Sequence, residues 1–325
     1  MLNKQIIAKV LLRKEFADNP PVLLDIGASG KTYEPWNEIA KYSICVAFDA
    51  DAREIKHIED GSGGYKKIYV YNKIVTSSNN KEEYFYLTKS PYCSSLLEPN
   101  IISLADWSFG DLFSVEKVAK IKTVNLNQAL TELNIKQIDW FKTDSQGTDL
   151  RLFASLNSGI INKILAADFE PGIIDAYTGE DKLGTLLSYM DKLPFWVDEM
   201  KLPKTVRIKK ETKKLLSEKV GNQIENNLNY ILKSSPFCAE ISFLNNFKSF
   251  ENFNLRDFLL MWTIAYLKKQ YAFALEIASM GTEKFNDEVF DELKDVIIKK
   301  INQKIRILKI KKIFFGLINL IKKIR

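Results

Sequence analysis

A stretch of small residues beside an acid is the first feature of the chain that could bind a ligand. Asp25-Ile26-Gly27-Ala28-Ser29-Gly30 follows the apolar run Val22–Leu24. Small side chains let the backbone approach a ligand closely, and glycine tolerates a positive φ angle. A loop of this kind before a helix can hold a nucleotide or a carboxylate on its free N–H groups. A tight turn without a ligand can have the same composition, so this loop alone leaves both interpretations open.

Asp49 stands where a second acidic group would complete a nucleotide site. The apolar run Ser43–Phe48 ends at this residue, roughly twenty positions after the loop. An acid at that spacing can accept hydrogen bonds from both hydroxyls of a ribose. The spacing suits a dinucleotide enzyme as well as a methyltransferase. A helix N-cap is the alternative role for an acid here, and Asp51 is the better placed of the two for it.

Asp144 is the third acidic residue at an expected strand end. It follows the strand Ile138–Thr143 and begins the segment Asp144-Ser145-Gln146-Gly147. Ligands of open α/β sheets bind at the carboxyl edge, where such strand ends lie. Asp144 could instead cap the helix expected from Thr148, but Asp149 competes for that role.

These three strand ends need a sheet that brings them to one edge. Further apolar runs alternate with stretches of helical periodicity, which predicts a parallel sheet covered by helices on both faces. We predict an α/β domain over residues 1–248 with a helical insert at about 204–235, then a helical extension over 249–325. The other expected strands are 67–71, 83–87, 163–169, 195–199 and 238–244, and the expected helices of this domain are 2–17, 34–41, 115–134, 149–156 and 181–190.

Composition narrows the chemistry. The chain has 325 residues, three cysteines that lie far apart, and one histidine, His57. A metal site built on several His or Cys ligands is therefore excluded, whereas a carboxylate site is not, and no metal ligand is predicted. The cysteine usage fits a reducing compartment. The N-terminus lacks a long apolar signal core and no run approaches the ~20 apolar residues that span a bilayer, so we expect a cytoplasmic protein.

A wider series of segments accompanies the three strand ends: Leu23–Gly30, Ala47–Asp51, Cys93–Pro99, Val124–Leu126, Ile138–Leu150, Asp168–Pro171 with Tyr177, Phe195–Glu199 and Ala239–Leu244. In this order the series resembles the FkbM family of methyltransferases, over roughly residues 20–245. Lys142–Gly147 is its most distinctive piece. The chain departs from the family in three places: Asp49-Ala50 replaces a usual Glu-Pro, Asn125 replaces a common Asp, and the first loop lacks the third glycine of many methyltransferases.

The resemblance implies a Rossmann-like fold with a doubly wound, mostly parallel, seven-stranded sheet, and a methyl donor, S-adenosyl-L-methionine. Family members methylate hydroxyl oxygens, so the implied acceptor is a hydroxyl of a saccharide, a glycolipid or a similar small molecule. By resemblance, Asp49 holds the ribose of the cofactor with Asp51 beside it, and the methionine part is lined by Asp25, Gly27, Ala28, Ser29 and Gly30.

An O-methyltransferase must align an oxygen with the sulfonium methyl and remove the proton of the alcohol. Asp144 is the first candidate for the base because it lies at a strand end near the expected methyl position, and Glu170, at the next strand end, is the second. His57 is the third, but its acidic neighbours are typical of a solvated helix. Lys142 points away from the pocket or pairs with Asp144, which would lower the basicity of that carboxylate.

Two other classes of protein fit part of the pattern. An NAD-linked oxidoreductase of the Rossmann type would use the same loop and Asp49. It would also need a catalytic donor such as Tyr-x-x-x-Lys, which is not seen at a suitable position, and it leaves Lys142–Gly147 unexplained. A non-catalytic protein that kept the methyltransferase fold and lost the base is the second alternative.

The C-terminal segment is basic and amphipathic. In residues 296–325, one helical stripe contains Ile307, Ile310, Phe314, Leu317, Ile321 and Ile324, and lysines surround it. Such a helix can lie in an anionic membrane surface, which would place the protein on the inner face of the membrane, or it can dock on the protein's own core. Nucleic-acid binding is not expected, because the stripe lacks interleaved readout residues. The pattern predicts no particular oligomeric state.

Overall fold

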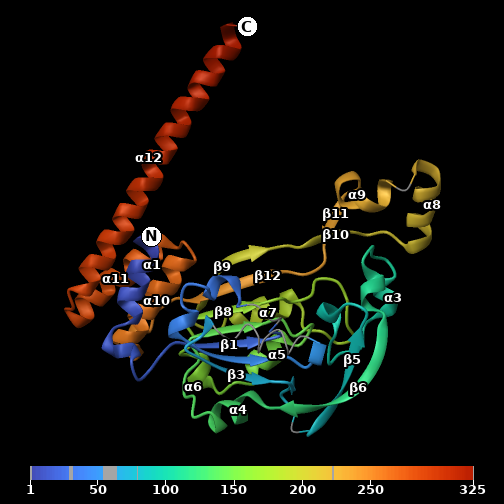
Figure 1. Ribbon diagram of the computed structural model, residues 1–325, viewed down its shortest axis with the longest axis horizontal. Helices are drawn as coiled ribbons and strands as arrows, with labels where there is room; N and C mark the ends of the chain where they lie inside the picture. Colours follow the sequence, from blue (N-terminus) through green and yellow to red (C-terminus); the bar gives the residue numbers. More distant parts are fainter. Residues whose placement is uncertain (1, 29–31, 54–63, 79, 222, 325) are drawn as a thin grey trace. The chain divides into compact units, whose positions relative to one another are not determined.

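The computed structural model describes residues 2–28, 32–53, 64–78, 80–221 and 223–324 (Figure 1). The chain divides into two compact units, one formed by residues 19–248 and the other by residues 1–18 together with 249–325. We call them the α/β unit and the helical unit, and describe each by itself.

A seven-stranded sheet organises the α/β unit (Figure 1). Its strands are β1 (Val22–Ile26), β2 (Ile44–Phe48), β3 (Lys67–Tyr71), β7 (Trp140–Thr143), β8 (Ala166–Phe169), β9 (Phe195–Lys201) and β12 (Glu240–Asn245). They lie in the order β3-β2-β1-β7-β8-β12-β9. The pairings from β3 to β8 are parallel, whereas β12 is antiparallel to both β8 and β9. The prediction of a mostly parallel sheet is confirmed.

Apolar side chains cover both faces of the sheet at its centre. All five residues of β1 are buried, as is usual for a strand inside a parallel sheet. On one face, Phe141 of β7 meets the ring of Phe153 edge-on, with 5.1 Å between the centroids. The helices that contribute to this core are α4 (Leu126–Glu132), α5 (Asp149–Ala154), α6 (Ser158–Ile161) and α7 (Leu183–Met190). On the other face, Trp36 and Trp140 are fully buried against each other.

The predicted helix over residues 115–134 is wrong for most of its length. Residues Val115–Val124 form the strand β6, which pairs with β5 (Glu82–Thr88) and β4 (Ile74–Val75) in a separate three-stranded sheet. Valine, isoleucine and threonine at intervals along this run favour an extended strand, and its many lysines suit a strand exposed on most of its length. The helix α4 begins only after Asn125, whose side chain accepts hydrogen bonds from two backbone N–H groups of the first turn.

Several other short elements border the sheet. The expected helix over 34–41 is reduced to two 3₁₀ turns, η2 (Glu34–Trp36) and η3 (Ala40–Tyr42). Pro35 fits the first of these turns, since proline is tolerated at the start of a helix. The segment between β5 and β6 contains η5 (Pro91–Cys93), α3 (Ile101–Leu104) and η6 (Gly110–Phe113).

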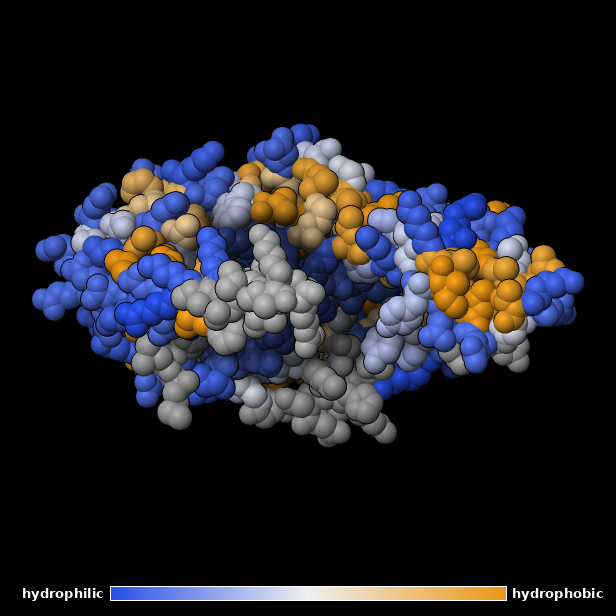
Figure 2. Space-filling model, turned by 90° about the horizontal axis from the view of Figure 1, so that it is seen from above, coloured by the Kyte–Doolittle hydropathy of each residue, from blue (hydrophilic) through white to orange (hydrophobic). Residues whose placement is uncertain are grey.

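The insert at 204–235 is helical between two short strands. It consists of β10 (Lys204–Val206), α8 (Lys210–Val220), α9 (Gln223–Ile231) and β11 (Ser234–Pro236). A small core of its own holds it together, with Val206, Ile208, Ile224 and Leu228 buried. Figure 2 shows hydrophobic residues gathered over α9 and bordered by hydrophilic ones, at the right of the view.

The helical unit contains α1 (Leu2–Leu11), η1 (Lys14–Phe16), η7 (Phe250–Asn252), α10 (Leu255–Leu267), α11 (Tyr271–Phe285) and α12 (Val289–Ile324). The division of the chain therefore differs from the predicted domain 1–248, because residues 1–18 belong to the helical unit. The reason is local packing: α1 contacts α10. Arg13 also forms an ion pair with Asp287 at 2.6 Å.

Asn254 caps α10 in a capping box with Asp257. Nearly every residue of α10 is buried, so this helix forms the centre of the helical unit. Among the described residues, no helix is both long and apolar enough to cross a membrane.

Candidate active site

The loops that follow β1 and β7 touch each other at the carboxyl edge of the sheet. Gly27 has a φ angle of +74°, and a Cβ atom on this residue would lie 2.1 Å from the backbone oxygen of Asp144. The Asp144 N–H donates to the Ile26 carbonyl at 2.9 Å. Both the positive φ and the close approach require glycine. The chain order reverses between β1 and β7, and ligands of open α/β sheets bind at such a switch point.

A pocket opens at this edge of the sheet. Gly27, Asp49, Asp51 and Asp144 all line it, so the structure brings together residues from three strand ends. Its remaining lining residues are Ile26, Phe48, Ala50, Lys73, Ile74, Val75, Phe85, Pro91, Tyr92, Ser94, Leu96, Ser145, Gln146 and Thr148.

The other predicted residues either do not line the pocket or lie outside the described residues. Ala28 is buried, with 4% exposure, and does not line the pocket. Ser29 and Gly30 lie outside the described residues, as does His57. Asp25 does not line the pocket either, because its side chain is committed to an ion pair.

Asp25 and Lys142 form this ion pair between neighbouring strands. They are partners in the register of β1 and β7, so their side chains leave the sheet on the same face. The Lys142 ammonium lies 2.9 Å from Asp25 Oδ1 and also donates to the Gly27 carbonyl at 3.0 Å. Burial alone would lower the pKa of Lys142, but the nearby Asp25 and Asp144 carboxylates raise it above its usual value. Lys142 is thus a charged partner of Asp25, and not the direct partner of Asp144.

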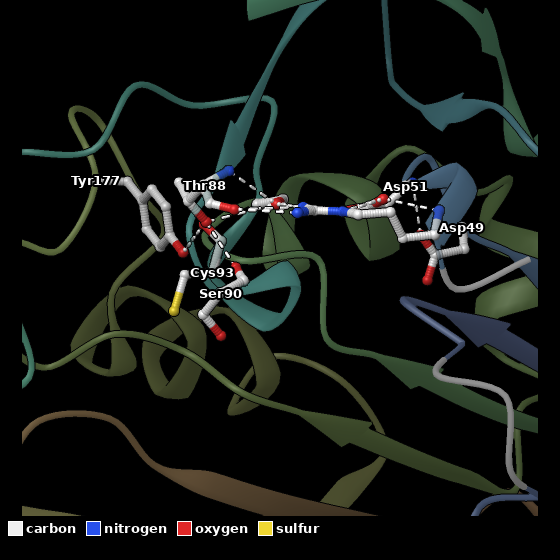
Figure 3. A network of polar contacts seen from close by, with 8 residues as sticks. Asp49, Asp51, Thr88, Ser90, Cys93 and Tyr177 are labelled. Atoms are coloured by element: carbon white, nitrogen blue, oxygen red, sulfur yellow. Dashed lines mark hydrogen bonds and ion pairs between the residues drawn. The ribbon is translucent and has the colours of Figure 1, made fainter. Parts of the chain in front are cut away.

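Asp49 and Asp51 differ in their surroundings (Figure 3). Asp49 Oδ1 accepts the Asp51 N–H at 2.7 Å, which fixes the turn after β2. The Asp51 carboxylate is 3% exposed and is held by Arg53, both through an ion pair at 2.5 Å and through the Arg53 backbone N–H. The last contact is the one that a helix N-cap makes. Asp51 is therefore held by Arg53 and acts as a cap, and Asp49, which also lines the pocket, stays the candidate for contact with a ligand.

Arg53 ties the end of β2 to the wall of the pocket. Its guanidinium donates to the Thr88 carbonyl at 3.3 Å and to Ser94 Oγ at 3.1 Å (Figure 3). Thr88 in turn donates to the Ser90 carbonyl at 2.7 Å. The segment after β5 is thereby held against the strand end that contains Asp49.

Asp144 and Glu170 form a pair of hydrogen-bonded carboxyl groups. Burial, together with the nearby Asp144 and Asp149 carboxylates, raises the pKa of Glu170 to about 9. Burial also raises the pKa of Asp144, although Lys142 opposes this effect. Two carboxyl groups this close do not both ionise readily, so near neutral pH Glu170 holds a proton and donates it to Asp144.

The sequence assigned no role to Gln146 and Tyr177, which brace this carboxyl pair. Gln146 Nε2 donates to Asp144 Oδ1 at 2.5 Å, and the Tyr177 hydroxyl lies 2.9 Å from Gln146 Oε1 and from the Cys93 carbonyl. Gln146 has a φ angle of +56° and the next residue, Gly147, one of +105°. A non-glycine residue in the left-handed region is uncommon and is concentrated at functional sites. In the sequence, the pair Gln146-Gly147 inside the segment Lys142–Gly147 is the feature that could have pointed to this brace.

Asp149 keeps the same loop in place and leaves Asp144 uncommitted to a cap. Its Oδ1 accepts hydrogen bonds from Thr143 and Ser145, and its Oδ2 accepts the Glu170 N–H at 3.0 Å. The N-cap position of α5 is Thr148. The capping role considered for Asp144 is therefore ruled out.

Among the described residues, no group of three or more His, Cys, Asp and Glu side chains is arranged to hold a metal ion. The carboxyl groups at this edge are instead engaged with lysine, glutamine, backbone N–H groups and each other. Comparison with known proteins adds no relative: no protein-family model, no curated protein and no solved structure matches the chain.

Proposed function

We propose that the chain is an S-adenosyl-L-methionine-dependent O-methyltransferase, as its resemblance to the FkbM family implies. The observation that supports this most is the shared pocket into which the Gly27 loop, Asp49 and Asp144 converge from three neighbouring strand ends. These are the positions at which the methionine part, the ribose and the reacting methyl group would lie.

The sheet topology favours this function over an NAD-linked oxidoreductase. Strands of the dinucleotide-binding fold follow the order 3-2-1-4-5-6. Here the first five positions follow the same order, but β12 is inserted, in the opposite direction, between β8 and β9. This departure agrees with the seven-stranded sheet that the resemblance implies, and the two halves of a dinucleotide fold do not require it.

The lining residues suit an adenosine-bearing ligand. The Asp49 carboxylate lies in the turn after β2 and lines the pocket, where the two hydroxyls of a ribose can donate hydrogen bonds to it. The side chains of Ile74, Val75 and Phe85 supply apolar surface on the same pocket for a flat base. The Gly27 loop presents backbone in place of side chains.

Asp144 is the proposed base. The cofactor supplies an activated methyl group, so the protein must mainly position the acceptor oxygen and accept its proton. Asp144 lines the pocket, and its carboxylate accepts a proton held by Glu170 in the free protein. An acceptor hydroxyl in that pocket would donate to the same carboxylate. Burial keeps the basicity of Asp144 high, and the hydrogen bond from Glu170 opposes this effect. The proposed acceptor is a hydroxyl of a saccharide or glycolipid.

The first test is calorimetric titration of the full chain with S-adenosylhomocysteine and, separately, with NADH. We expect heat only with S-adenosylhomocysteine. Asp49→Asn should weaken that binding roughly ten- to hundred-fold, because hydrogen bonds to a charged group are stronger than those to a neutral one. Asp18→Asn, an exposed acid of the helical unit, is the matched control and should bind as the parent does. Heat with NADH alone would overturn the proposal.

The second test separates an enzyme from a non-catalytic relative. Transfer of labelled methyl from S-adenosylmethionine to saccharide and glycolipid extracts should fall by roughly 10²- to 10⁴-fold in Asp144→Asn, the usual contribution of a general base. Binding of S-adenosylhomocysteine should persist in that variant. Equal transfer by the parent and the variant would contradict the role of Asp144.

A further inference from the structure

The helix α12 changes character along its length. Its 36 residues make it about 54 Å long at 1.5 Å per residue. The first part packs on α11: Phe290, Leu293 and Ile297 are fully buried. A Cβ atom on Gly281 of α11 would lie 2.4 Å from the Phe290 ring, so this ring packs directly on the backbone of α11. Further along, the Lys304 ammonium still lies over the Tyr271 ring, 4.6 Å from its centre.

The next part of α12 has its apolar residues in water. Every residue from 302 to 312 is exposed. Four of them are large and apolar: Ile305, Ile307, Leu308 and Ile310 are 43%, 53%, 57% and 55% exposed. Docking on the core of the helical unit would bury one face of this stretch, and within that unit residues 302–312 have no buried face. A set of exposed apolar side chains on one element marks an interaction surface.

The charge of the segment restricts the partner. Asp295 is the last acidic residue of the chain. After it come ten basic residues and no acid: Lys299, Lys300, Lys304, Arg306, Lys309, Lys311, Lys312, Lys322, Lys323 and Arg325. A partner that covers the apolar residues must therefore also neutralise a dense positive charge.

A second copy of the chain is the obvious alternative partner. Ile307 and Ile310 begin a stripe with alternating spacings of three and four residues, which is also typical of a coiled coil. Two copies of this helix would bring only cations to the flanks of the seam, however. Like charges at those positions oppose pairing, whereas an anionic lipid surface attracts them and accepts the apolar side chains at the same time.

We propose that α12 from residue 302 onward docks the protein on an anionic phospholipid surface, with Ile307 and Ile310 inserted and Lys309, Lys311 and Lys312 against the headgroups. The sequence continues with the apolar run Ile313–Ile321 and then with Lys322 and Lys323, which extends the same pattern. This attachment is peripheral, since no described helix can span the bilayer. It does not depend on the proposed methyl transfer.

Flotation of the full chain with vesicles tests the proposal. Vesicles of phosphatidylcholine with phosphatidylglycerol should carry the protein to the top of the gradient at low salt, and pure phosphatidylcholine should not. The variant Lys309→Gln/Lys311→Gln/Lys312→Gln should bind roughly 100-fold more weakly, because each lysine at an anionic surface strengthens binding roughly five-fold. The variant Ile307→Ser/Ile310→Ser should also lose binding, and since both residues are exposed it should fold as the parent does.

A charge-matched control lies on the insert. Lys210→Gln/Lys214→Gln/Lys219→Gln removes three exposed lysines of α8 and changes the net charge by the same amount. It should bind vesicles nearly as the parent does. Equal loss in the two lysine variants would overturn the proposal, because binding would then follow total charge. The proposal would also be overturned if the parent chain did not bind anionic vesicles, or if it dimerised through Ile307 and Ile310 instead of binding them.

Discussion

Asp25 and Asp144 lie near the same edge of the sheet, on neighbouring strands, in opposite electrostatic surroundings. Asp25 is buried at 4% exposure and has the Lys142 ammonium 2.9 Å away. Asp144 lines the pocket, and its side chain is hydrogen-bonded to the Gln146 amide and to another carboxyl group, that of Glu170. One acid is thus neutralised by an ion pair, while the other shares a proton with a second acid.

The difference separates a structural carboxylate from a reactive one. The Asp25 carboxylate is buried, is held by the Lys142 ammonium and does not line the pocket. Burial, with the nearby Asp149 carboxylate, raises the pKa of Asp144, which lines the pocket. Paired titratable groups whose surroundings raise their pKa values are typical of acid–base sites. Replacing the partner of each acid should therefore have a different effect in each case.

The largest expected effect is on stability, from the variant Lys142→Met. It leaves the Asp25 carboxylate buried without a cation, and breaking such a pair costs about 3–5 kcal/mol of unfolding free energy. Urea denaturation measures the change. The double variant Asp25→Asn/Lys142→Met should regain a large part of the loss, because no unpaired charge remains. Equal stabilities of the single and double variants would show that the ion pair is not the source of the effect.

A second prediction concerns Gly27, whose backbone lies between the two acids. Gly27→Ala forces a residue with a side chain into a φ angle of +74° and places Cβ against the Asp144 carbonyl. Backbone strain of this kind costs about 1–3 kcal/mol, and the loop shift should also abolish S-adenosylhomocysteine binding.

The matched control for Gly27 is Gly184→Ala. Gly184 lies in α7, where an added Cβ would meet no atom within 4 Å and the φ angle is an ordinary one. There the same substitution should stabilise the protein by about 0.4–1 kcal/mol, since alanine reduces the freedom of the unfolded chain. The two variants should thus shift the urea midpoint in opposite directions, and a shift in the same direction would contradict the strain argued for Gly27.

The sequence was sufficient to place Gly27, Asp49 and Asp144 in one site, because strand ends of a parallel sheet meet at one edge whatever the details of packing. It was not sufficient for the Asp25–Lys142 pair. That contact depends on the register between β1 and β7, in which the two residues are direct partners. Strands joined through a long stretch of chain leave their register open in a single sequence. The bracing by Gln146 and Tyr177 depends in the same way on a tertiary contact.

The wrong elements have physical causes too. Residues 115–124 contain charges at nearly regular intervals, which agree with an exposed helix as well as with an exposed strand. Pairing with β5 decides between them. The N-terminal helix α1 is amphipathic, but its pattern does not say which apolar surface it covers, and the structure pairs it with α10.

The pH dependence of stability is the third prediction. The pKa of Glu170 rises on folding from its ordinary value of 4.5 to about 9, so between these values the folded state binds more protons than the unfolded state. Stability from this group is complete below the lower value and is lost as the pH rises through the upper one. The unfolding free energy should therefore decrease from pH 5 to pH 9, by at most about 1.4 kcal/mol per pH unit.

Glu170→Gln cannot titrate and should flatten this slope. Urea denaturation at several pH values gives the unfolding free energies. If those of the parent and of Glu170→Gln changed equally with pH, the proton assigned to Glu170 would be contradicted.

The smallest expected effect is that of Gln146→Met, which removes the donor to Asp144 and the acceptor of the Tyr177 hydroxyl without removing bulk. The Gln146 hydrogen bond lowers the pKa of Asp144, so its loss should raise that pKa and move the acid limb of the pH–rate profile upward. One such bond is equivalent to about 1 kcal/mol, or roughly a five-fold change in rate at a fixed pH on the acid limb. Tyr177→Phe should cause a smaller shift in the same direction, because it acts on Asp144 only through Gln146. If turnover fell in both variants while the pH–rate profile kept its shape, Gln146 and Tyr177 would position the acceptor and would not set the pKa of Asp144.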